Sequence, residues 1–549
     1  MIQPLCHLSV ALILAGVSPN QDVWIGLELP RGPVASQLEP RVRLLRDGRH
    51  IRAAEDAPPK DGVDASALLP ESIVTSLLNE TVRRTRSNAK ILPGTSPLLV
   101  RGSEAEISEL EQILTELAAL ERALAIELHV RLAPTAGGAS WIDSRRSVHS
   151  GDRSAFGERQ VSAFLGGYGV DVASDSAVAD PLVGQVHSGH SLHVIAKRMQ
   201  GGRATHIEGV LDLATTRTTG AIDTGNPDLG IVQLPVCDVV QISFSGIATP
   251  DRALVVTLTG ALAGEDLQLT IAATAESIAQ WKPAGWSVLD AAQITSTSMD
   301  PTHFGPGWML EQQEQRRNDE RGRARSSITP GSLIGIASED FGREAELLWT
   351  PRLIFVPPGT PLAVEVLSTM IAALERPALT THRLRIESDR GSIECCVAGA
   401  ARMRAIVGTE RLALVDYETE LAPETWIAAP IVEWAFDGFA LEGRVQRGTF
   451  ETSCWISRSD YTTELAAHEV GLGRIQLPQR SVRTMHANLE PGVLVELLPT
   501  ALVASKRSED SMEQATLEEA SSNAAGKPGT RDHEDSARTT FLRAMLLGS

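Results

Sequence analysis

Three histidines in the segment HSGHSLH have the spacing that comes nearest to a metal site in this chain. His187, His190 and His193 could bind Zn²⁺ through three imidazoles and leave a fourth position open, as catalytic zinc sites do. In a strand, however, side chains alternate between the two faces, so His190 points away from the other two. A similar later segment, residues 436–442, holds two Phe and one Glu at the corresponding positions. We therefore predict no metal site here.

Other residue patterns that carry chemistry are missing or isolated. The sequence contains no GxxxxGK[ST], HExxH or GxSxG motif, and no GxGxxG between a strand and a helix. Asp171, Asp175 and Asp180 lie near Glu158 in sequence, but no partner fixes their geometry, so we interpret them as solvated loop charges. The sequence predicts no catalytic residue, no cofactor and no enzymatic activity.

Length and composition exclude several classes of protein. The chain has 549 residues, of which 42% are hydrophobic and 22% charged, which is typical of several globular units. The net charge of −19 argues against nucleic acid as a partner, because phosphate binding needs clustered positive charge. Five cysteines are too few for a disulfide-stapled fold, and the adjacent Cys395 and Cys396 favour buried packing over metal binding.

The first 20 residues resemble an export signal. The apolar run LSVALILAGV, residues 8–17, has the length of a signal-peptide core and is shorter than the roughly 20 residues of a membrane-spanning helix. No Lys or Arg precedes it, so a buried strand or helix is the alternative. We expect an exported protein of the cell envelope, in the periplasm or outer membrane, and leave membrane association open.

Three segments in the first half of the chain have counterparts, in the same order, in the second half. Residues 98–132 correspond to residues 353–386, residues 178–194 to residues 427–443, and LGIVQLP to LGRIQLP. The offsets are 254, 249 and 243 residues, from which we infer a tandem duplication. The aligned positions are Pro181 with Pro430, Gly189 with Gly438, Gln233 with Gln476, and Pro235 with Pro478.

Each copy reads as a strand and a helix followed by many strands. In the first copy Ser103 and Glu106 form a capping box, and apolar residues then recur with the period of a helix. In the second copy Thr360 is the expected N-cap and Pro361 the first helical residue. The alternating segments that follow, such as SLHVIAKRM, ALVVTLTG and GVLVELLP, predict antiparallel strands. We therefore expect a β-rich α+β protein made of two tandem units.

These patterns divide the chain into eight parts. The dense polar run at residues 311–325 predicts a linker, and the nearly apolar-free residues 505–540 predict disorder. For the last apolar residues we favour a frayed tail over a docked helical turn. The predicted parts are a signal peptide (1–20), an N-terminal segment (21–69), a first α/β module (70–135), a first β-module (136–280), a polar linker (281–329), a second α/β module (330–387), a second β-module (388–504) and a disordered acidic tail (505–549).

The repeated segments resemble secretins, the outer-membrane proteins of type II and type III secretion and pilus systems. LLVRGSEAEISELEQILTELAALE is similar to the module that builds the periplasmic rings of secretins. YGVDVASDSAVADPLVGQVHSGHSLHV, followed by LGIVQLP, resembles the start of the secretin β-domain. The likeness is closest to the divergent secretin-like proteins of planctomycete-type bacteria. Its landmark residues here are Asp180, Pro181, Gly189, Gln233 and Pro235 in the first copy, and Pro430, Gly438, Gln476 and Pro478 in the second.

The resemblance implies structural roles for these landmarks and an assembly for the chain. Gly189 and Gly438 would supply turns with positive φ, and the prolines would lie at strand starts or edges. A secretin-like protein is implied to form a homo-oligomeric ring and to contact secretion-system or other envelope proteins. Neither copy has the closing VP.LGdIP.LG.LF signature of secretins, and aromatic residues make up only 4% of the chain. The alternative is therefore a soluble periplasmic adaptor or binding protein that kept the fold without the pore.

Overall fold

The computed structural model describes about two thirds of the chain. The described residues are 23–27, 71–92, 98–172, 177–199, 203–223, 229–262, 264–278, 281–295, 329–341, 347–350, 352–399, 401–421, 426–446, 449–465, 474–498 and 542–547. Strands dominate them and the large sheets are antiparallel, which confirms the predicted β-rich α+β class. The predicted signal peptide, the polar run at 311–325 and residues 505–540 lie outside the described residues.

Eight long strands form one sheet, which we call the long-strand sheet. Its order is β20-β19-β18-β17-β9-β8-β7-β6, and every neighbouring pair is antiparallel. The strands are β6 (Arg153–Val172), β7 (Ala177–Arg198), β8 (Thr205–Asp223), β9 (Ile231–Ala248), β17 (Arg402–Leu421), β18 (Trp426–Gln446), β19 (Thr449–Leu465) and β20 (Arg474–Leu489).

Eight shorter strands form a second antiparallel sheet, the short-strand sheet. Its order is β21-β22-β15-β16-β10-β11-β4-β5. The strands are β4 (Ala125–Pro134), β5 (Ile142–His149), β10 (Leu254–Leu262), β11 (Glu265–Ala275), β15 (Thr381–Ser388), β16 (Gly391–Ala398), β21 (Leu494–Leu498) and β22 (Leu542–Leu547). The two sheets share one apolar core, to which the long-strand sheet gives residues such as Leu211 and Ile242 and the short-strand sheet residues such as Leu269 and Ile386. They are therefore the two layers of a β-sandwich.

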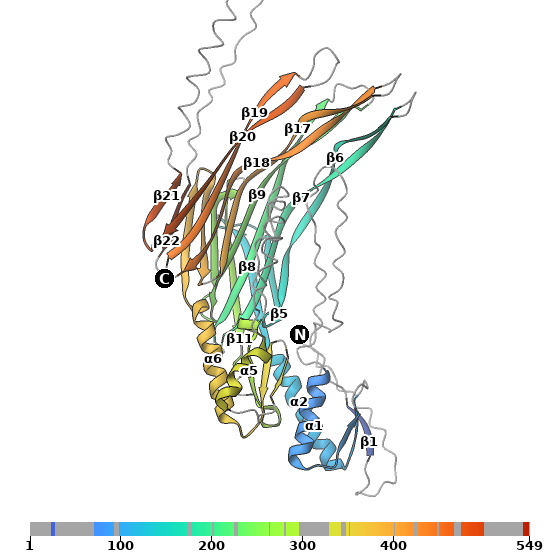
Figure 1. Ribbon diagram of the computed structural model, residues 1–549, viewed down its shortest axis with the longest axis vertical. Coiled ribbons are helices and arrows are strands. Elements are labelled where there is room, and N and C mark those ends of the chain that lie inside the picture. The colour runs from blue at the N-terminus through green and yellow to red at the C-terminus, as the bar shows by residue number, and fades with distance from the viewer. Residues whose placement is uncertain are drawn as a thin grey trace, which may run out of the picture.

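Two small α/β modules lie together at one end of the sandwich, whereas the long hairpins extend from the other end (Figure 1). The N-terminal module contains β1 (Val23–Leu27), α1 (Glu71–Thr85), β2 (Lys90–Leu92), β3 (Leu98–Gly102) and α2 (Glu104–Ala123), with the sheet order β1-β3-β2. The central module contains η1 (Pro283–Gly285), β12 (Ser287–Asp290), α3 (Ala292–Thr295), α5 (Pro330–Phe341), β13 (Leu348–Trp349), β14 (Leu353–Val356) and α6 (Pro361–Leu379), with the order β12-β14-β13.

Local sequence explains where the two long helices begin. Helix α2 starts at the predicted capping box, because Ser103 accepts a hydrogen bond from the Glu106 amide and Glu106 accepts one from the Ser103 amide at 2.8 Å. The bond from the Ser103 amide, together with hydrogen bonds from Ser87 and Asn88, lowers the pKa of Glu106 to about 2. Helix α6 starts at Pro361 as predicted, but the Thr360 hydroxyl donates to the Pro357 carbonyl at 2.6 Å rather than capping the helix through its side chain.

The structure differs from the predicted boundaries in three places. Residues 281–329 are not only linker, because β12 and α3 belong to the central module. The two α/β modules end with α2 and α6, because β4 and β15 belong to the short-strand sheet. The chain end is not a frayed tail: β22 inserts between β15 and β21, where Leu542, Ala544 and Leu546 are completely buried. Burial of these apolar side chains is the physical reason why the chain returns to the sheet.

Candidate assembly site

The long-strand sheet has a seam where strands from the two halves of the chain meet. Here β9 pairs with β17 in an antiparallel register that runs from Ile242 opposite Ala405 to Val236 opposite Arg411. On one side of this seam lie β6, β7, β8 and β9, and on the other side lie β17, β18, β19 and β20. Each half thus contributes four strands that are consecutive along the chain.

The short-strand sheet has a seam of the same kind. There β10 pairs with β16, from Thr257 opposite Glu394 to Thr259 opposite Ser392. The first half contributes the order β10-β11-β4-β5 and the second half the order β21-β22-β15-β16. Each half again contributes four strands, and β22, the C-terminal strand, is one of them.

Among the described strands, β6 and β20 end the long-strand sheet, and β5 and β21 end the short-strand sheet. The middle of β6 is open to solvent, since Gln160, Val161, Ser162 and Ala163 are all exposed. Four consecutive exposed residues mean that neither face of the strand is covered at this level. An exposed strand edge offers backbone amides and carbonyls to another strand.

Polar side chains gather at the long-strand seam, and Asp238, Thr409 and Glu410 among them are buried. The Thr409 hydroxyl donates to Asp238 Oδ1 at 2.7 Å across the seam. Arg390 donates to the Thr409 hydroxyl at 3.0 Å and pairs with Asp437 at 2.6 Å. Glu410 lies opposite Cys237, and burial, with a smaller contribution from Asp212, raises the pKa of Glu410 to about 8. Glu410 is therefore mostly uncharged at neutral pH.

A second group of buried charges joins the sandwich to both modules. Arg198 at the end of β7 donates to the Ala123 carbonyl at the end of α2 at 2.6 Å and to the Ala125 carbonyl at the start of β4 at 3.2 Å. Its guanidinium also lies 3.6 Å from Asp290 of the central module. Burial raises the pKa of Asp290, although Arg198 opposes that shift. One arginine thus connects three parts of the structure.

Further buried polar residues lie next to Arg198, and we call this whole group, Arg198, Asp290, Lys197, Glu208, His206 and Gln293, the polar joint. Lys197 pairs with Glu208 at 2.8 Å, and both side chains are buried. His206 lies 3.1 Å from Gln293 of α3, and burial lowers the pKa of His206, which favours the neutral imidazole. Paired and hydrogen-bonded charges can be buried in this way, whereas isolated ones would destabilise the fold. The joint fixes the modules on the sandwich.

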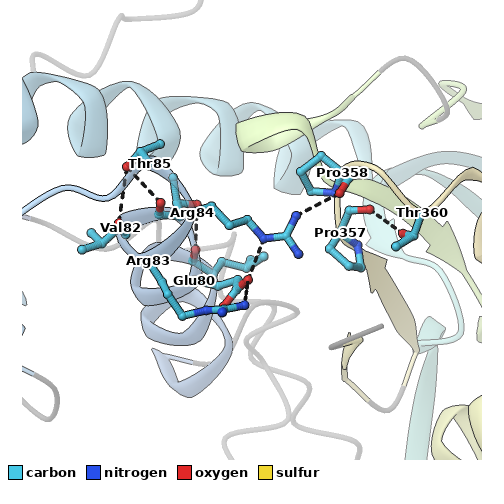
Figure 2. Close-up of polar contacts among 10 residues, drawn as sticks. Glu80, Val82, Arg83, Arg84, Thr85, Pro357, Pro358 and Thr360 are labelled. Carbon is cyan, nitrogen blue, oxygen red and sulfur yellow. Dashed lines mark hydrogen bonds and ion pairs between the residues drawn. The ribbon is translucent and has the colours of Figure 1, made fainter. Parts of the chain in front are cut away.

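The two modules also touch each other directly, as Figure 2 shows. Arg84 of α1 extends from the N-terminal module and donates to the Pro358 carbonyl of the central module at 2.9 Å. Glu80 holds the same guanidinium at 2.6 Å, and its hydrogen bond from Arg83 is the main reason why the pKa of Glu80 falls to about 2. Arg84 also stacks 5.4 Å from the ring centre of Trp286.

The histidine segment is part of the long-strand sheet. His187, His190 and His193 all lie in β7, opposite Val161, Glu158 and Ala155 of β6. The His190 ring lies 5.9 Å from the ring of Trp141, and burial lowers its pKa. Among the residues that the structure describes, no group of three His, Cys, Asp or Glu side chains is placed to hold a metal ion.

The landmark prolines lie where a strand has a neighbour on one side only. Pro181 pairs with Tyr168, in the part of β7 that precedes its pairing with β8, and Pro430 pairs with Tyr417, in the part of β18 that precedes its pairing with β19. Pro235 lies just outside the β9–β17 seam, and Pro478 lies in β20. The missing amide of proline therefore leaves no gap in a ladder.

The other landmarks are also in strands. Asp180 pairs with Gly169, and Gln476 pairs with Thr463. The Gln233 side chain accepts a hydrogen bond from the Leu165 amide at 2.8 Å and so connects β9 to β6.

The two landmark glycines differ from the predicted turns. Gly189 has the expected positive φ, 112°, but it lies within β7, where a Cβ would be 2.3 Å from the Glu158 carbonyl oxygen. Gly438 has no positive φ; it lies within β18, where a Cβ would be 2.2 Å from the Val407 carbonyl oxygen. The prediction of a turn is wrong for both, because close approach of the neighbouring strand is what requires glycine here.

The described cysteines are packed as apolar residues. Cys237, Cys395 and Cys454 are buried free thiols. Burial raises the pKa of the Cys237 and Cys454 thiols to about 12 and raises that of Cys395 further. Because the thiolate is the reactive form, these side chains are poor nucleophiles and poor metal ligands at neutral pH.

Sequence reasoning missed the residues of the polar joint and the seam. Arg198, Glu208 and Glu410 lie in strands that mix polar and apolar residues, so the local sequence does not mark them as buried. Within the part of the chain that the structure describes, none of the helices is long and apolar enough to span a membrane.

Comparisons with protein families, with curated proteins and with solved structures find no match for this chain.

Proposed function

We propose that this chain is a non-enzymatic, secretin-like protein of the cell envelope, in which two tandem units form part of a larger wall built from copies of the same chain. The observation that carries the proposal is the arrangement of the two seams. In both sheets, four strands from the first half of the chain are followed by four strands from the second half, in equivalent order. The N-terminal module has the order β-α-β-β-α, and the central module has the same order except that the short helix α3 precedes α5.

The strand equivalences follow from the sequence repeat. β6 corresponds to β17 and β9 to β20, and in the short-strand sheet β5 corresponds to β16 and β10 to β21. The pairing of β9 with β17 inside the chain therefore has a counterpart between chains, in which β20 of one copy pairs with β6 of the next. The pairing of β10 with β16 has its counterpart in β21 and β5. Both sheets therefore predict that the second half of one copy, through β20 and β21, pairs with the first half of the same next copy, through β6 and β5.

The repeat also gives the register of the contact between copies. Ala405 corresponds to Phe156 and Ile242 to Met485, whereas Arg411 corresponds to Ser162 and Val236 to Gln479. Residues 156–162 of one copy should therefore pair antiparallel with residues 479–485 of another. Gln160 and Ser481 are opposite each other in this register.

Such a contact joins two different surfaces, so it does not end at a dimer. Heterologous contacts give a ring if the rotation closes and an open fibre if it does not. A ring removes the exposed edges of β6, β20, β5 and β21, which would otherwise invite aggregation. The resemblance to secretins supports the ring, the envelope location and a role with secretion or pilus-type assemblies.

The experiment has two parts. Membrane and soluble fractions of the native host are analysed on gels with and without boiling, and a heat-sensitive multimer in the envelope fraction is expected. Separately, protein carrying Gln160→Cys is mixed with protein carrying Ser481→Cys, refolded together and oxidised. A disulfide-linked heterodimer is expected, because each chain carries only one of the two new cysteines.

The control replaces Ser481→Cys with Asn488→Cys, which lies in the same strand but out of register with Gln160. This pair should give no linked product. A soluble species of 58.8 kDa without cross-linking would contradict the proposed assembly of copies. The periplasmic adaptor would then be the better interpretation of the function. Equal cross-linking of both pairs would contradict the register.

A further inference from the structure

The two modules bury different amounts of their helices. In the N-terminal module, apolar residues of α1 and α2 form one core with Trp286, Val288, Leu353 and Phe355 of the central module. The helices of the first module therefore pack on the outer face of the β12-β14-β13 sheet. The Arg84 contact with Pro358 and a hydrogen bond from the Ala284 amide to Glu116 at 3.0 Å complete this interface.

Strand β14 shows that the central sheet is covered on both faces. Ile354 and Val356 belong to the core under α5 and α6. Leu353 and Phe355 point to the other face and belong to the core that contains α1 and α2. All four residues are buried, as expected for a strand between two layers of helices.

The helices of the central module expose the positions that the N-terminal module buries. Counted from the first residues of the two helices, Val74 and Leu78 of α1 correspond to Leu333 and Ala337 of α5, and all four are buried. The residue before Leu78 is Leu77, which is 2% exposed, whereas the residue before Ala337 is Ile336, which is 61% exposed.

Helix α6 shows the same difference. Leu117 and Ile371 are equivalent and completely buried, but Leu120 is 0% exposed where its counterpart Leu374 is 40% exposed. Among the described residues, α5 and α6 thus each expose an apolar side chain at a position that α1 and α2 bury against the central module.

We propose that this face of α5 and α6, which contains Ile336 and Leu374, docks on the outer face of the β1-β3-β2 sheet in the N-terminal module of a second copy. The inference rests on the proposed function and names a further contact of the same assembly. Within the chain, α1 and α2 cover the outer face of the β12-β14-β13 sheet, and the equivalent surface of the second copy is the outer face of its β1-β3-β2 sheet. This sheet lies in the first half of that copy, as do the strands β6 and β5 that are proposed to pair with β20 and β21. The module contact and the two strand contacts therefore involve the same neighbouring copy.

The outer face of the β1-β3-β2 sheet fits this role. Val100 is completely buried under its own helices, so Leu99 and Arg101 on either side of it point outward. Leu92 is 45% exposed, and Lys90 and Arg101 are exposed. On α5, Asp340 is exposed one helical turn after Ile336 and so lies on the same face. An apolar centre with opposite charges around it is typical of a specific contact.

Contacts within the chain indicate which residues should meet. α1 contacts β13 of the central module, and β13 holds the place in its sheet that β2 holds in the N-terminal module. Helix α5 should therefore meet β2 of the neighbouring copy. Ile336 on α5 and Leu92 on β2 are the exposed apolar residues that this contact brings together.

The test mixes full-length protein carrying Ile336→Cys with full-length protein carrying Leu92→Cys under oxidising conditions. A disulfide-linked heterodimer is expected in the assembled fraction. The control pairs Leu92→Cys with Glu365→Cys, which is exposed on the side of α6 opposite Leu374, and should give no heterodimer. A third variant, Ile336→Asp, should keep the Gln160–Ser481 cross-link and make the multimer fall apart at a lower urea concentration than Ile336→Val does.

The outcomes separate this contact from the wall itself. If the Gln160–Ser481 bond forms and the Ile336–Leu92 bond does not, the module contact is overturned and the proposed wall stands. If neither bond forms and the protein is monomeric, the proposed function fails and the module contact fails with it. If the Glu365 control links as well as Ile336, the orientation of the helices is wrong.

Discussion

Replacing Glu410 with Gln should change how the stability of the protein depends on pH. Glu410 is 3% exposed at the seam between β9 and β17, and its pKa is raised to about 8 from the usual 4.5, first by burial and then by Asp212. Between these two pH values the folded chain holds a proton on Glu410 that the unfolded chain releases. The free energy of unfolding therefore falls as the pH rises through this range.

The size of the effect follows from the two pKa values. Each pH unit between them changes the contribution of Glu410 by about 1.4 kcal/mol, so the contribution should fall by about 3 kcal/mol from pH 5.5 to 7.5. Glutamine has nearly the same shape and does not titrate. The Glu410→Gln variant should therefore lose this part of the slope and become more stable than the wild type towards pH 7.5.

The assay is urea unfolding of both proteins at pH 5.5, 6.5 and 7.5, and the quantity of interest is the difference between them. Other groups affect both proteins equally: His206, whose pKa is lowered by burial, adds stability as the pH rises through the ordinary histidine range. The pH range ends at 7.5, below the pH at which thiols of the unfolded chain lose their protons. Above it, the buried cysteines would add their own pH dependence to the free energy of unfolding. A constant difference between the two proteins across the three pH values would refute the account of Glu410.

Two further changes test the fold. Ending the chain at Leu498 removes β22 and the buried side chains of Leu542 and Leu546, so the free energy of unfolding should fall by about 1.5–3 kcal/mol for each leucine and the urea midpoint should fall with it; an unchanged midpoint would mean that β22 adds nothing to the sheet. Gly189→Ala should cost about 3 kcal/mol or more, because the methyl group meets the Glu158 carbonyl at a positive φ. Gly264→Ala, also at positive φ but with no atom within 4 Å, should cost only about 1–2 kcal/mol in the same unfolding assay, and equal losses would argue against close strand approach at Gly189.

The sequence predicts best what neighbouring residues decide. Helix α2 follows from its capping box and apolar period, and its predicted apolar face is buried. The strands around SLHVIAKRM and ALVVTLTG follow from alternation and β-branched residues. Both patterns act over a few residues, so no knowledge of the rest of the fold is needed.

Contacts between distant segments are what the sequence does not predict. Strand β22 is separated from β21 by residues 499–541 and pairs with β15, which ends at Ser388, so no local pattern connects them. Arg198 resembles an ordinary charged strand residue until the carbonyls of Ala123 and Ala125 and the carboxylate of Asp290 come together around it. The two edges of the sandwich likewise depend on strand order, which residue spacing does not contain.

The position of β22 also constrains when the protein can finish folding. Strand β21 reaches the short-strand sheet through β22, from which residues 499–541 separate it. Until residues 542–547 have been synthesised, β15 lacks its β22 partner and β21 has no described neighbour in its sheet. The modules and the first four long strands can form before that, since their partners precede them or follow closely. The second layer is therefore completed only after β22 has been made, and until then the folding chain carries a vacant strand position between β15 and β21.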